Sequence, residues 1–484
     1  MSAVSIHHPL EGLFHPRSIA IIGASKSDRD TGWVGRLLSS GYKGKIYPVN
    51  PNAKEIDGLK AYPNIRDIPG VVEYAILNIP AHLTPQAILD CAAKGVKFVH
   101  CFTAGFSETG TKKASRLEAR IAQIARDRGI RLLGPNCMGI YCPASRMTFN
   151  ADFPQKRGPV AFVSQSGTEA MRLLFLAHDI NIYFSKVISY GNAIDLDAPD
   201  FLEYLADDED TKIIACYIEG SRQVARLTSA VKKCLQKKPV VVLKGGSTRS
   251  GAGAVAFHTA SPTGSKASWD NFFKKTGAIS ANTMDEVADI IQTLSRIKPP
   301  KGRRVALVGR GGGIGVIAAD ICERASLEVP SFSNNTRKRL SQIISEVGIS
   351  TQNPVETMTG MSGAVDFYLR GLSIVDEDTE TDIILVQIAI DIYGGRNTDL
   401  TPEVRDAAYA LCATADSLKK PLAVVLFTGG HPKATKEALI TRRILTKAGI
   451  PVYSGVESAS QAISKVIDYY GNDSGKTKTR FNYL

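Results

Sequence analysis

Short runs of apolar, often β-branched residues alternate along the whole chain with amphipathic stretches. Ten runs predict buried strands: SIAIIG (18–23), KIYPVN (45–50), EYAILNIP (73–80), VKFVHCF (96–102), PVAFVSQ (159–165), KIIACYIEG (212–220), KPVVVLKG (238–245), RVALVGR (304–310), DIILVQIAI (382–390) and PLAVVLFTG (421–429). Stretches such as 113–129 and 229–238 carry apolar residues at helical spacing instead. Strands that are apolar almost throughout are typical of parallel sheets covered on both faces. The pattern predicts an α/β protein with doubly wound, mainly parallel sheets.

The predicted elements group into three similar units. A length of 484 residues suggests about three domains of roughly 150 residues. Each unit opens with a buried strand, a small-residue loop and a helix: IAIIGAS, VAFVSQSG and VALVGRGGGIG. Stretches rich in proline and charge, 151–159 and 296–304, read as linkers between them. We therefore predict Rossmann-like or flavodoxin-like domains at 1–152, 153–297 and 303–475, with a tail at 476–484.

The composition is that of an ordinary globular protein, with 44% hydrophobic and 22% charged residues. No apolar run approaches the roughly 20 residues of a membrane span, and the N-terminus lacks the features of a signal peptide. The eight cysteines are scattered, without the spacing of a metal site. These observations predict a cytoplasmic protein with reduced thiols, no bound metal and no membrane contact.

The net charge of +12 favours anionic partners. Lys and Arg are spread thinly, and no nucleic-acid-binding motif is present. Small molecules that carry phosphate fit this charge as well, and we predict no nucleic-acid partner.

The three strand–helix loops are candidate anion sites, because small residues let backbone N–H groups approach a phosphate at a helix start. The first loop contains Gly23 and Ser25 but lacks the G-x-G-x-x-G pattern. The next strand ends in Asn50 and Pro51 where an NAD site usually has a carboxylate, which disfavours an NAD oxidoreductase. The second and third loops supply the following candidates: Ser164, Gln165, Ser166, Gly167, Gly311, Gly312 and Gly313.

One histidine lies in a stretch with little periodicity, GAGAVAFHTASPTG (251–264). We expect a mobile connection of about 20 residues there, between the strand ending at residue 245 and a helix beginning near Lys266; connections this long are often functional. Neutral imidazole is a nucleophile near pH 7, so His258 is a candidate covalent nucleophile; the alternative is a surface histidine in a loose loop. His431, which follows another strand, is its best rival.

Glu219 ends the strand KIIACYIEG, at the edge where open α/β sheets build their sites. Its carboxylate is placed to accept an N–H from His258, which would fix the tautomer of the ring. The alternative is an acid on the solvent-exposed rim.

The order and spacing of several segments resemble the ADP-forming acyl-CoA synthetases, relatives of succinyl-CoA synthetase. The resemblance is to the α-type subunit and covers nearly the whole chain. The segments that carry it are FHPRSIAIIGAS, YPVNP, GPNCMGI, VAFVSQSG, YIEG, VVVLKGGSTRSGAGA followed by HT, and GRGGGIGVIAAD followed by NPVE.

The resemblance implies a CoA-binding domain followed by two flavodoxin-like ligase domains. His258 would be the phosphorylated histidine, steadied by Glu219, and the helices after the second and third loops would point at the phosphoryl group. Acyl-CoA and phosphate would form an acyl phosphate, and His258 would carry the phosphoryl group to ADP; the reverse direction activates a small carboxylic acid with ATP. The implied CoA site comprises Gly23, Ser25, Pro48, Asn50, Pro51, Ala104, Gly105 and Asn136.

No ATP-grasp region is found, and one would need about 200 more residues. The resemblance therefore implies a separate ATP-grasp β-type subunit that binds ATP or ADP with Mg²⁺, and a hetero-oligomer. The chain departs from the family after His258, where it reads Thr259-Ala260-Ser261-Pro262, and has Glu356 where Asp is usual. These departures keep a second hypothesis open, a non-catalytic CoA-binding regulatory protein of the same fold. The identity of the acid, ADP versus GDP, the direction and the subunit stoichiometry are left open.

Overall fold

The computed structural model describes residues 8–25, 32–259, 261–309, 311–344, 348–357, 360–390 and 401–471. The chain divides into two compact units, a first unit of residues 1–175 with 183–284 and a second unit of residues 176–182 with 285–484. The tail predicted at 476–484, together with Ala260 and Arg310, lies outside the described residues.

The first unit contains two larger sheets, and the one nearer the N-terminus is entirely parallel, in the order β2-β1-β5-β6-β7. Its strands are Ser18–Ile22 (β1), Lys45–Val49 (β2), Tyr74–Leu77 (β5), Phe98–Cys101 (β6) and Arg131–Leu133 (β7). The accompanying helices are Glu11–Phe14 (α1), Trp33–Ser39 (α2), Thr84–Ala93 (α3) and Lys112–Asp127 (α4), and Glu55–Ile56 (β3) pairs with Leu59–Lys60 (β4). Ile88 of α3 and Ile121 of α4 are fully buried in one cluster with the central strands, so these helices cover the sheet.

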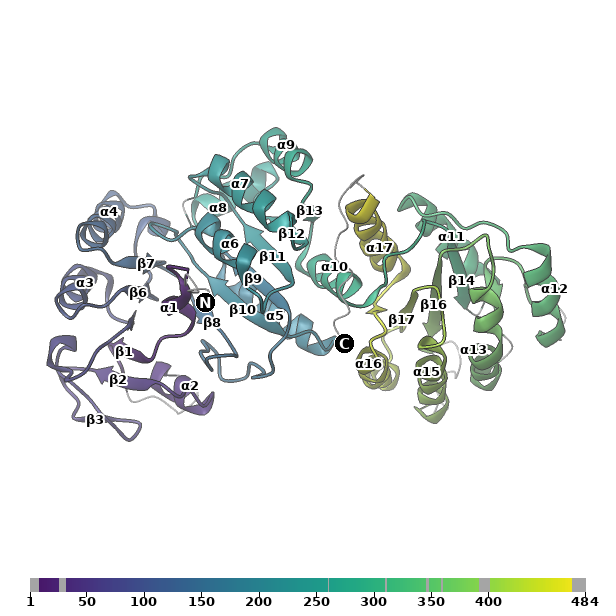
Figure 1. Ribbon diagram of the computed structural model, residues 1–484, viewed down its shortest axis with the longest axis horizontal. Helices are drawn as coiled ribbons and strands as arrows, with labels where there is room; N and C mark the ends of the chain where they lie inside the picture. Colours follow the sequence, from purple (N-terminus) through teal and green to yellow (C-terminus); the bar gives the residue numbers. More distant parts are fainter. Residues whose placement is uncertain are drawn as a thin grey trace, which may run out of the picture. The chain divides into compact units, whose positions relative to one another are not determined.

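The second sheet of this unit has the order β13-β12-β11-β9-β10-β8, in which only β8 runs antiparallel. Its strands are Gly139–Tyr141 (β8), Val160–Ser164 (β9), Phe184–Ser189 (β10), Ile213–Ile218 (β11), Val240–Lys244 (β12) and Ile279–Ala281 (β13). The helices are Gly167–Asp179 (α5), Ala198–Asp207 (α6), Val224–Leu235 (α7), Arg249–Ala256 (α8) and Lys266–Thr276 (α9). Figure 1 shows α6 and α7 side by side over this sheet. Strand β8 precedes the predicted boundary at 152 yet pairs with β10, so the chain passes from the first sheet to the second before that boundary.

The second unit is built on a third, parallel sheet in the order β15-β14-β16-β17-β18. Its strands are Val305–Gly309 (β14), Val355–Glu356 (β15), Ile383–Ala389 (β16), Leu422–Phe427 (β17) and Val452–Tyr453 (β18). The helices are Met284–Arg296 (α10), Gly312–Arg324 (α11), Asn334–Ile343 (α12), Gly360–Asp376 (α13), Thr401–Ala415 (α15), Pro432–Lys447 (α16) and Val456–Gly471 (α17). Strand β16 is buried along its whole length, as expected for a central parallel strand.

All ten predicted strands are present, and the predicted α/β class is confirmed. The prediction of a continuous 20-residue connection around His258 is wrong, because helix α8 occupies residues 249–256. Thr248 caps this helix by accepting the backbone N–H of Gly251 at 3.1 Å. Glycine and alanine in α8 hide the helical periodicity, since small side chains carry little amphipathic signal. The three-domain boundaries stay a prediction.

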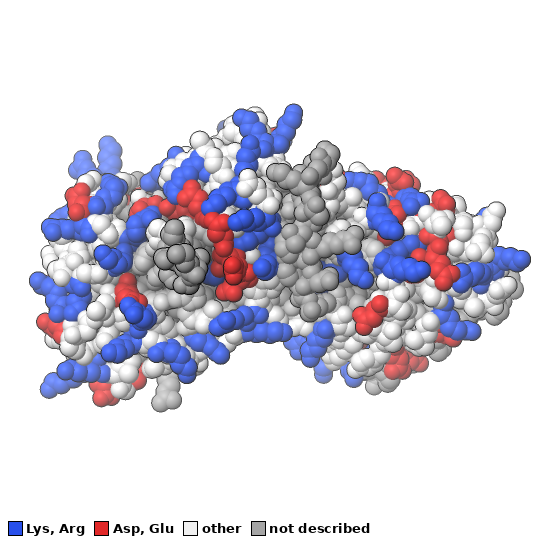
Figure 2. All heavy atoms as spheres, viewed as in Figure 1, with Lys and Arg blue, Asp and Glu red and all other residues white. Residues whose placement is uncertain are grey.

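The basic side chains are spread widely over the face seen in Figure 2, where Lys and Arg are interleaved with acidic residues. Part of this charge is paired within the fold: Asp207 on α6 lies 2.6 and 2.7 Å from the ammonium groups of Lys233 and Lys237. Across the described parts of the chain, every helix is too short or too polar to span a bilayer.

Candidate active site

His258 and Glu219 are in direct contact. Glu219 follows β11 and is 1% exposed, and its Oε1 lies 2.7 Å from Nδ1 of His258. The hydroxyl of Thr259 donates to the other carboxylate oxygen at 2.6 Å. The contact predicted from the sequence is therefore present. It uses Nδ1 of the ring and leaves Nε2 as the nitrogen available for chemistry.

The contact shifts both pKa values toward the charged forms. The hydrogen bond to Glu219 raises the pKa of His258 above its ordinary value of 6.5, although burial acts in the opposite direction. Burial alone would raise the pKa of Glu219, but the hydrogen bonds from His258 and Thr259 outweigh it, so the pKa lies below the ordinary value of 4.5. The carboxylate stays ionised near neutral pH and orients the imidazole.

Two further side chains support Glu219. The hydroxyl of Tyr217 donates to its Oε1 at 3.1 Å, and Nζ of Lys244 donates to its backbone carbonyl at 2.8 Å. Burial lowers the pKa of Lys244 to about 8, and its ammonium lies 5.2 Å from the ring centroid of Trp269. Sequence reasoning missed these residues. The spacing of Tyr217 and Glu219 was the available signal, because alternate residues of a strand share a face.

In the loop between β9 and α5, the serine side chains form hydrogen bonds with the backbone of the loop and of the helix start. The buried hydroxyl of Ser164 donates to the carbonyl of Ser166 at 2.6 Å, and the hydroxyl of Ser166 accepts the N–H of Glu169 at 3.3 Å. Among the described residues, the backbone N–H groups of Gly167 and Thr168 have no acceptor. Since the first N–H groups of a helix lack partners within it, these two remain available to a ligand.

Gln165 is also buried in this loop, at 1% exposure. Its Oε1 accepts the N–H groups of Glu219 and Gly220 at 2.8 and 3.2 Å, and its Nε2 donates to the hydroxyl of Ser261 at 2.7 Å. Gln165 was predicted to bind phosphate, but both the oxygen and the nitrogen of its amide are hydrogen-bonded within the protein.

A cavity of about 640 Å³ opens beside His258. Phe102, Ala104, Asn136 and Met138 contribute to its wall from the loops after β6 and β7, and Gln165, Gly167, Met171 and Thr259 contribute from the second sheet. None of the described residues that line this cavity is Lys, Arg, Asp or Glu. Its polar groups are the imidazole, amides and hydroxyls, and its remaining lining is small or apolar.

The residues predicted for CoA fall into three groups. Ala104 and Asn136 line the His258 cavity. Ser25 lines a neighbouring cavity of about 180 Å³ that shares Asn78 and Phe102 with the first.

The remaining five shape the surrounding loops. Gly23 has a φ of +86°, and a Cβ there would lie 2.1 Å from the carbonyl oxygen of Asn78, so only glycine lets the ends of β1 and β5 approach. Asn50 donates its amide to the carbonyl of Ala24 at 2.7 Å. Pro48 is buried in β2 and Pro51 is exposed, while the N–H of Gly105 donates to Glu108 at 2.6 Å.

Asn192, a residue that sequence reasoning missed, fastens these loops to the second sheet. It is 1% exposed, and its Nδ2 donates to Glu108 at 2.7 Å and to Glu118 at 2.8 Å. Its Oδ1 accepts the amide of Asn136 at 3.4 Å. A buried asparagine outside any motif gives no sequence signal, because its partners come from distant segments.

The third predicted loop belongs to the second unit. Gly311 has a φ of +98° and precedes α11. The carboxylate of Glu356 lies at this helix start, 3.2 Å from where a Cβ on Gly312 would stand. His431, the rival histidine, is exposed at the start of α16 in the same unit. The role of Gly311, Gly312 and Gly313 stays a prediction.

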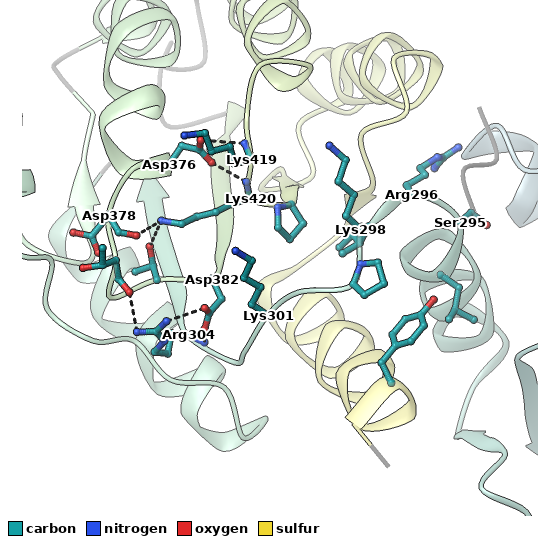
Figure 3. A pocket seen from close by; sticks show the side chains of 17 residues that line it. Ser295, Arg296, Lys298, Lys301, Arg304, Asp376, Asp378, Asp382, Lys419 and Lys420 are labelled. Atoms are coloured by element: carbon teal, nitrogen blue, oxygen red, sulfur yellow. Dashed lines mark hydrogen bonds and ion pairs between the residues drawn. The ribbon is translucent and has the colours of Figure 1, made fainter. Parts of the chain in front are cut away.

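The second unit contains a larger cavity, of about 930 Å³. Figure 3 shows Asp376 hydrogen-bonded to Lys420, and Arg304 paired with Asp382, on one wall, while Lys298 and Lys301 extend into the space. Across the described residues, no group of three or more His, Cys, Asp or Glu side chains is arranged to hold a metal.

Comparison with protein families finds two matched regions. Residues 17–143 match a CoA binding domain, and residues 157–294 match a succinyl-CoA ligase like flavodoxin domain. The first match contains the whole set of residues predicted for CoA, and the second contains Ser164–Gly167, Glu219 and His258.

Curated relatives match along almost the whole chain. The ADP-forming acetate–CoA ligase II subunit alpha of Pyrococcus furiosus is 34% identical over 467 residues, which cover 96% of this chain and 99% of the relative. The ADP-forming acetate–CoA ligase I of Archaeoglobus fulgidus is 34% identical over 97% of this chain but only 65% of the relative. Among solved structures, the dinucleotide forming acetyl-coenzyme A synthetase 1 of Ca. Korarchaeum cryptofilum, in complex with phosphate and ADP, has a TM-score of 0.81 and 31% identity, covering 96% and 97% of the two chains.

Proposed function

Because this chain belongs to the family of the ADP-forming acetate–CoA ligases as an alpha-type chain, we propose that it forms an acyl-CoA synthetase that works through phosphorylated His258. The reaction interconverts acyl-CoA, ADP and phosphate with a carboxylic acid, CoA and ATP. The observation that carries the proposal is the contact of His258 with ionised Glu219 at the edge of a cavity. The contact supports a histidine held in one tautomer rather than a loose surface residue.

The chemistry proceeds in three transfers. A phosphate oxygen attacks the thioester carbon of acyl-CoA, the C–S bond breaks, and CoA leaves as the thiol with a proton from the phosphate. Nε2 of neutral His258 then attacks the phosphorus of the acyl phosphate, and the carboxylate leaves with the electron pair of the broken P–O bond. A terminal oxygen of ADP finally attacks the phosphorus of phosphohistidine, which breaks the P–N bond and forms ATP. During the second transfer Glu219 accepts a hydrogen bond from Nδ1 and stabilises the positive charge that develops on the ring.

The start of α5 holds the phosphoryl group beside His258. The unpartnered N–H groups of Gly167 and Thr168 point to this role, because backbone donors at a helix start favour an anion. Within the predicted loop, the Ser164 hydroxyl is engaged by Ser166, so the backbone rather than this hydroxyl supplies donors. The start of α11, with Gly311, Gly312 and Gly313, is proposed as a separate phosphate-binding helix start within the second unit.

The domain predicted at 1–152 binds CoA. The thiol end of CoA enters the cavity beside His258, at Ala104 and Asn136. The match to a CoA binding domain over 17–143 supports this assignment. Ser25, in the neighbouring cavity, lies farther along the same ligand. Gly23, Pro48, Asn50, Pro51 and Gly105 shape the loops that receive it.

A separate ATP-grasp β-type subunit binds ATP or ADP with Mg²⁺ and completes a cytoplasmic hetero-oligomer. The name of the Pyrococcus furiosus relative, a subunit alpha, implies a further subunit in that protein. The Archaeoglobus fulgidus relative, whose name carries no subunit label, extends well beyond the matched region, since this chain covers only 65% of it. The difference in length supports a function divided between chains.

The test is phosphorylation of His258. The chain is mixed with its β-type partner, Mg-ATP, CoA and candidate acids, and acid-labile phosphate is located by mass spectrometry. We expect labelling of His258 in the wild type, none in His258→Ala, and a loss of turnover on the order of a thousandfold or more in that variant. Retained CoA binding by His258→Ala shows that the fold is intact. If wild type binds CoA but never labels, the non-catalytic regulatory function is the correct one.

A further inference from the structure

Four described residues of the segment that follows His258 contact other parts of the chain: Thr259, Ser261, Pro262 and Thr263. Thr259 donates to Glu219, the hydroxyl of Ser261 accepts from Gln165, and the carbonyl of Thr263 accepts the indole N–H of Trp269 at 2.8 Å. The carbonyl oxygen of Pro262 lies against Gly220, because a Cβ on Gly220 would stand only 2.1 Å from this oxygen. Thr259, Ser261 and Pro262 therefore pack against the residues that follow β9 and β11.

Gln165 is the side chain that joins this segment to both strands. Its Oε1 is fixed by the N–H groups of Glu219 and Gly220, which settles the orientation of the amide. Its Nε2 is then directed at the hydroxyl of Ser261. A buried amide with every one of these contacts satisfied holds one geometry, because turning it would leave two N–H groups without acceptors.

We infer that Gln165 and Ser261 form a clasp that keeps His258 docked at Glu219. The inference rests on the proposed function, in which His258 receives a phosphoryl group here and delivers it elsewhere. Gln165 acts through His258 and is a positioning residue rather than a catalytic one. Thr259, Ser261 and Pro262 are then the residues that dock onto this clasp.

The two steps of the reaction require opposite states of the clasp. Phosphorylation of His258 requires the docked position, while delivery of the phosphoryl group to ADP requires release. Weakening the clasp lowers the docked population and so slows the first step without slowing the second. A defect of the fold, by contrast, slows both steps together.

The experiment compares Ser261→Ala with two variants of the same segment. Ser261→Thr keeps the hydroxyl, and Thr263→Ala removes a hydroxyl that has no partner among the described residues. Single-turnover phosphorylation of His258 is measured with radiolabelled acetyl phosphate, and its discharge is measured with the β-type partner and ADP. Hydrogen exchange of residues 257–264 reports docking in the unmodified chain.

Ser261→Ala is expected to slow the phosphorylation of His258 about two- to tenfold, the effect of losing one neutral hydrogen bond. Discharge to ADP should be unchanged or faster. Hydrogen exchange of residues 257–264 should be faster. Ser261→Thr and Thr263→Ala are expected to match wild type. Equal phosphorylation rates for Ser261→Ala and Thr263→Ala would overturn the clasp, as would equal slowing of both steps. Absence of label in wild type would instead overturn the proposed function, and with it this inference.

Discussion

The cavity beside His258 has a volume of about 640 Å³ and the cavity of the second unit about 930 Å³, yet their linings differ in kind. The smaller has none of the four charged residue types among its described lining residues, and its one imidazole is oriented by a buried carboxylate. The larger is lined by nine such residues: Arg296, Lys298, Lys301, Arg304, Asp376, Asp378, Asp382, Lys419 and Lys420.

The buried charges of the larger cavity hold its own loops together. Asp376 accepts the backbone N–H groups of Lys419 and Lys420 at 3.0 and 2.8 Å. Nζ of Lys420 donates to the carbonyl of Val375 and the hydroxyl of Thr381, both at 2.9 Å. Volume and charge alone therefore do not identify a site. The informative feature is a reactive group that is oriented by the protein and still open to a ligand.

The largest effect expected within this comparison follows removal of the charge that orients His258. Glu219→Gln replaces the carboxylate by a neutral amide of the same size. We expect phosphorylation of His258 to slow about ten- to a hundredfold, the range for a hydrogen bond to a charged group, while CoA affinity stays nearly unchanged. Single-turnover labelling and calorimetric CoA binding measure the two quantities. An equal loss of both would indicate a defect of the fold instead.

The second prediction concerns pH. Attack requires neutral imidazole, and the contact with Glu219 raises the pKa of His258 above 6.5. The rate of His258 phosphorylation should therefore rise with pH through a midpoint above 6.5 and level off beyond it. In Glu219→Gln the midpoint should fall, because the largest cause of the upward shift is removed while burial still lowers the pKa. Carbon-13 NMR of labelled histidine gives an independent titration, and an unchanged midpoint would contradict the assigned contact.

The sequence predicts the framework of the first cavity well, because its signals are local. Apolar runs place the ends of β9 and β11 at one edge of a parallel sheet, and the family pattern selects His258 and Glu219. The rest depends on partners far apart in the chain. Gln165 reaches Ser261, 96 residues later, and Asn192 reaches Glu108, 84 residues earlier. Hydrogen bonds between residues so far apart in the chain produce no periodic sequence pattern from which they could be predicted.

Helix α8 was missed for a different reason. Its sequence, RSGAGAVA, has only one buried side chain, Val255, so a short helix there presents no apolar stripe. The cap by Thr248 is the usable signal, but a single threonine before glycine-rich sequence is common in loops as well.

The third prediction tests the structural role of the larger cavity. Asp376→Ala should lower the free energy of unfolding by about 1–3 kcal/mol, because the N–H groups of Lys419 and Lys420 lose a buried acceptor. Asp376→Asn, which keeps one acceptor oxygen, should lose less. Chemical denaturation measures the stability, and hydrogen exchange assigns the loss to the second unit. Labelling of His258 should remain at the wild-type rate; slowing as large as in Glu219→Gln, with stability unchanged, would mean that this region takes part in the reaction.

The smallest effect is expected from the ammonium groups that extend into the larger cavity. Lys298 and Lys301 are exposed and have no hydrogen-bond or ion-pair partner among the described residues. The double variant Lys298→Gln/Lys301→Gln should keep turnover within about twofold and stability within about 0.5 kcal/mol of wild type.

The matched control for this double variant is Lys274→Gln/Lys275→Gln, which removes the same charge from exposed positions at the end of α9. Both double variants should show the same slight dependence of turnover on ionic strength, since only long-range charge is altered. A fivefold or larger loss of turnover confined to the variant at Lys298 and Lys301 would contradict the distinction drawn between the two cavities. The larger cavity would then be a site for an anionic ligand, and the hydrogen bonds of Asp376 and Lys420 would no longer argue for a purely structural role.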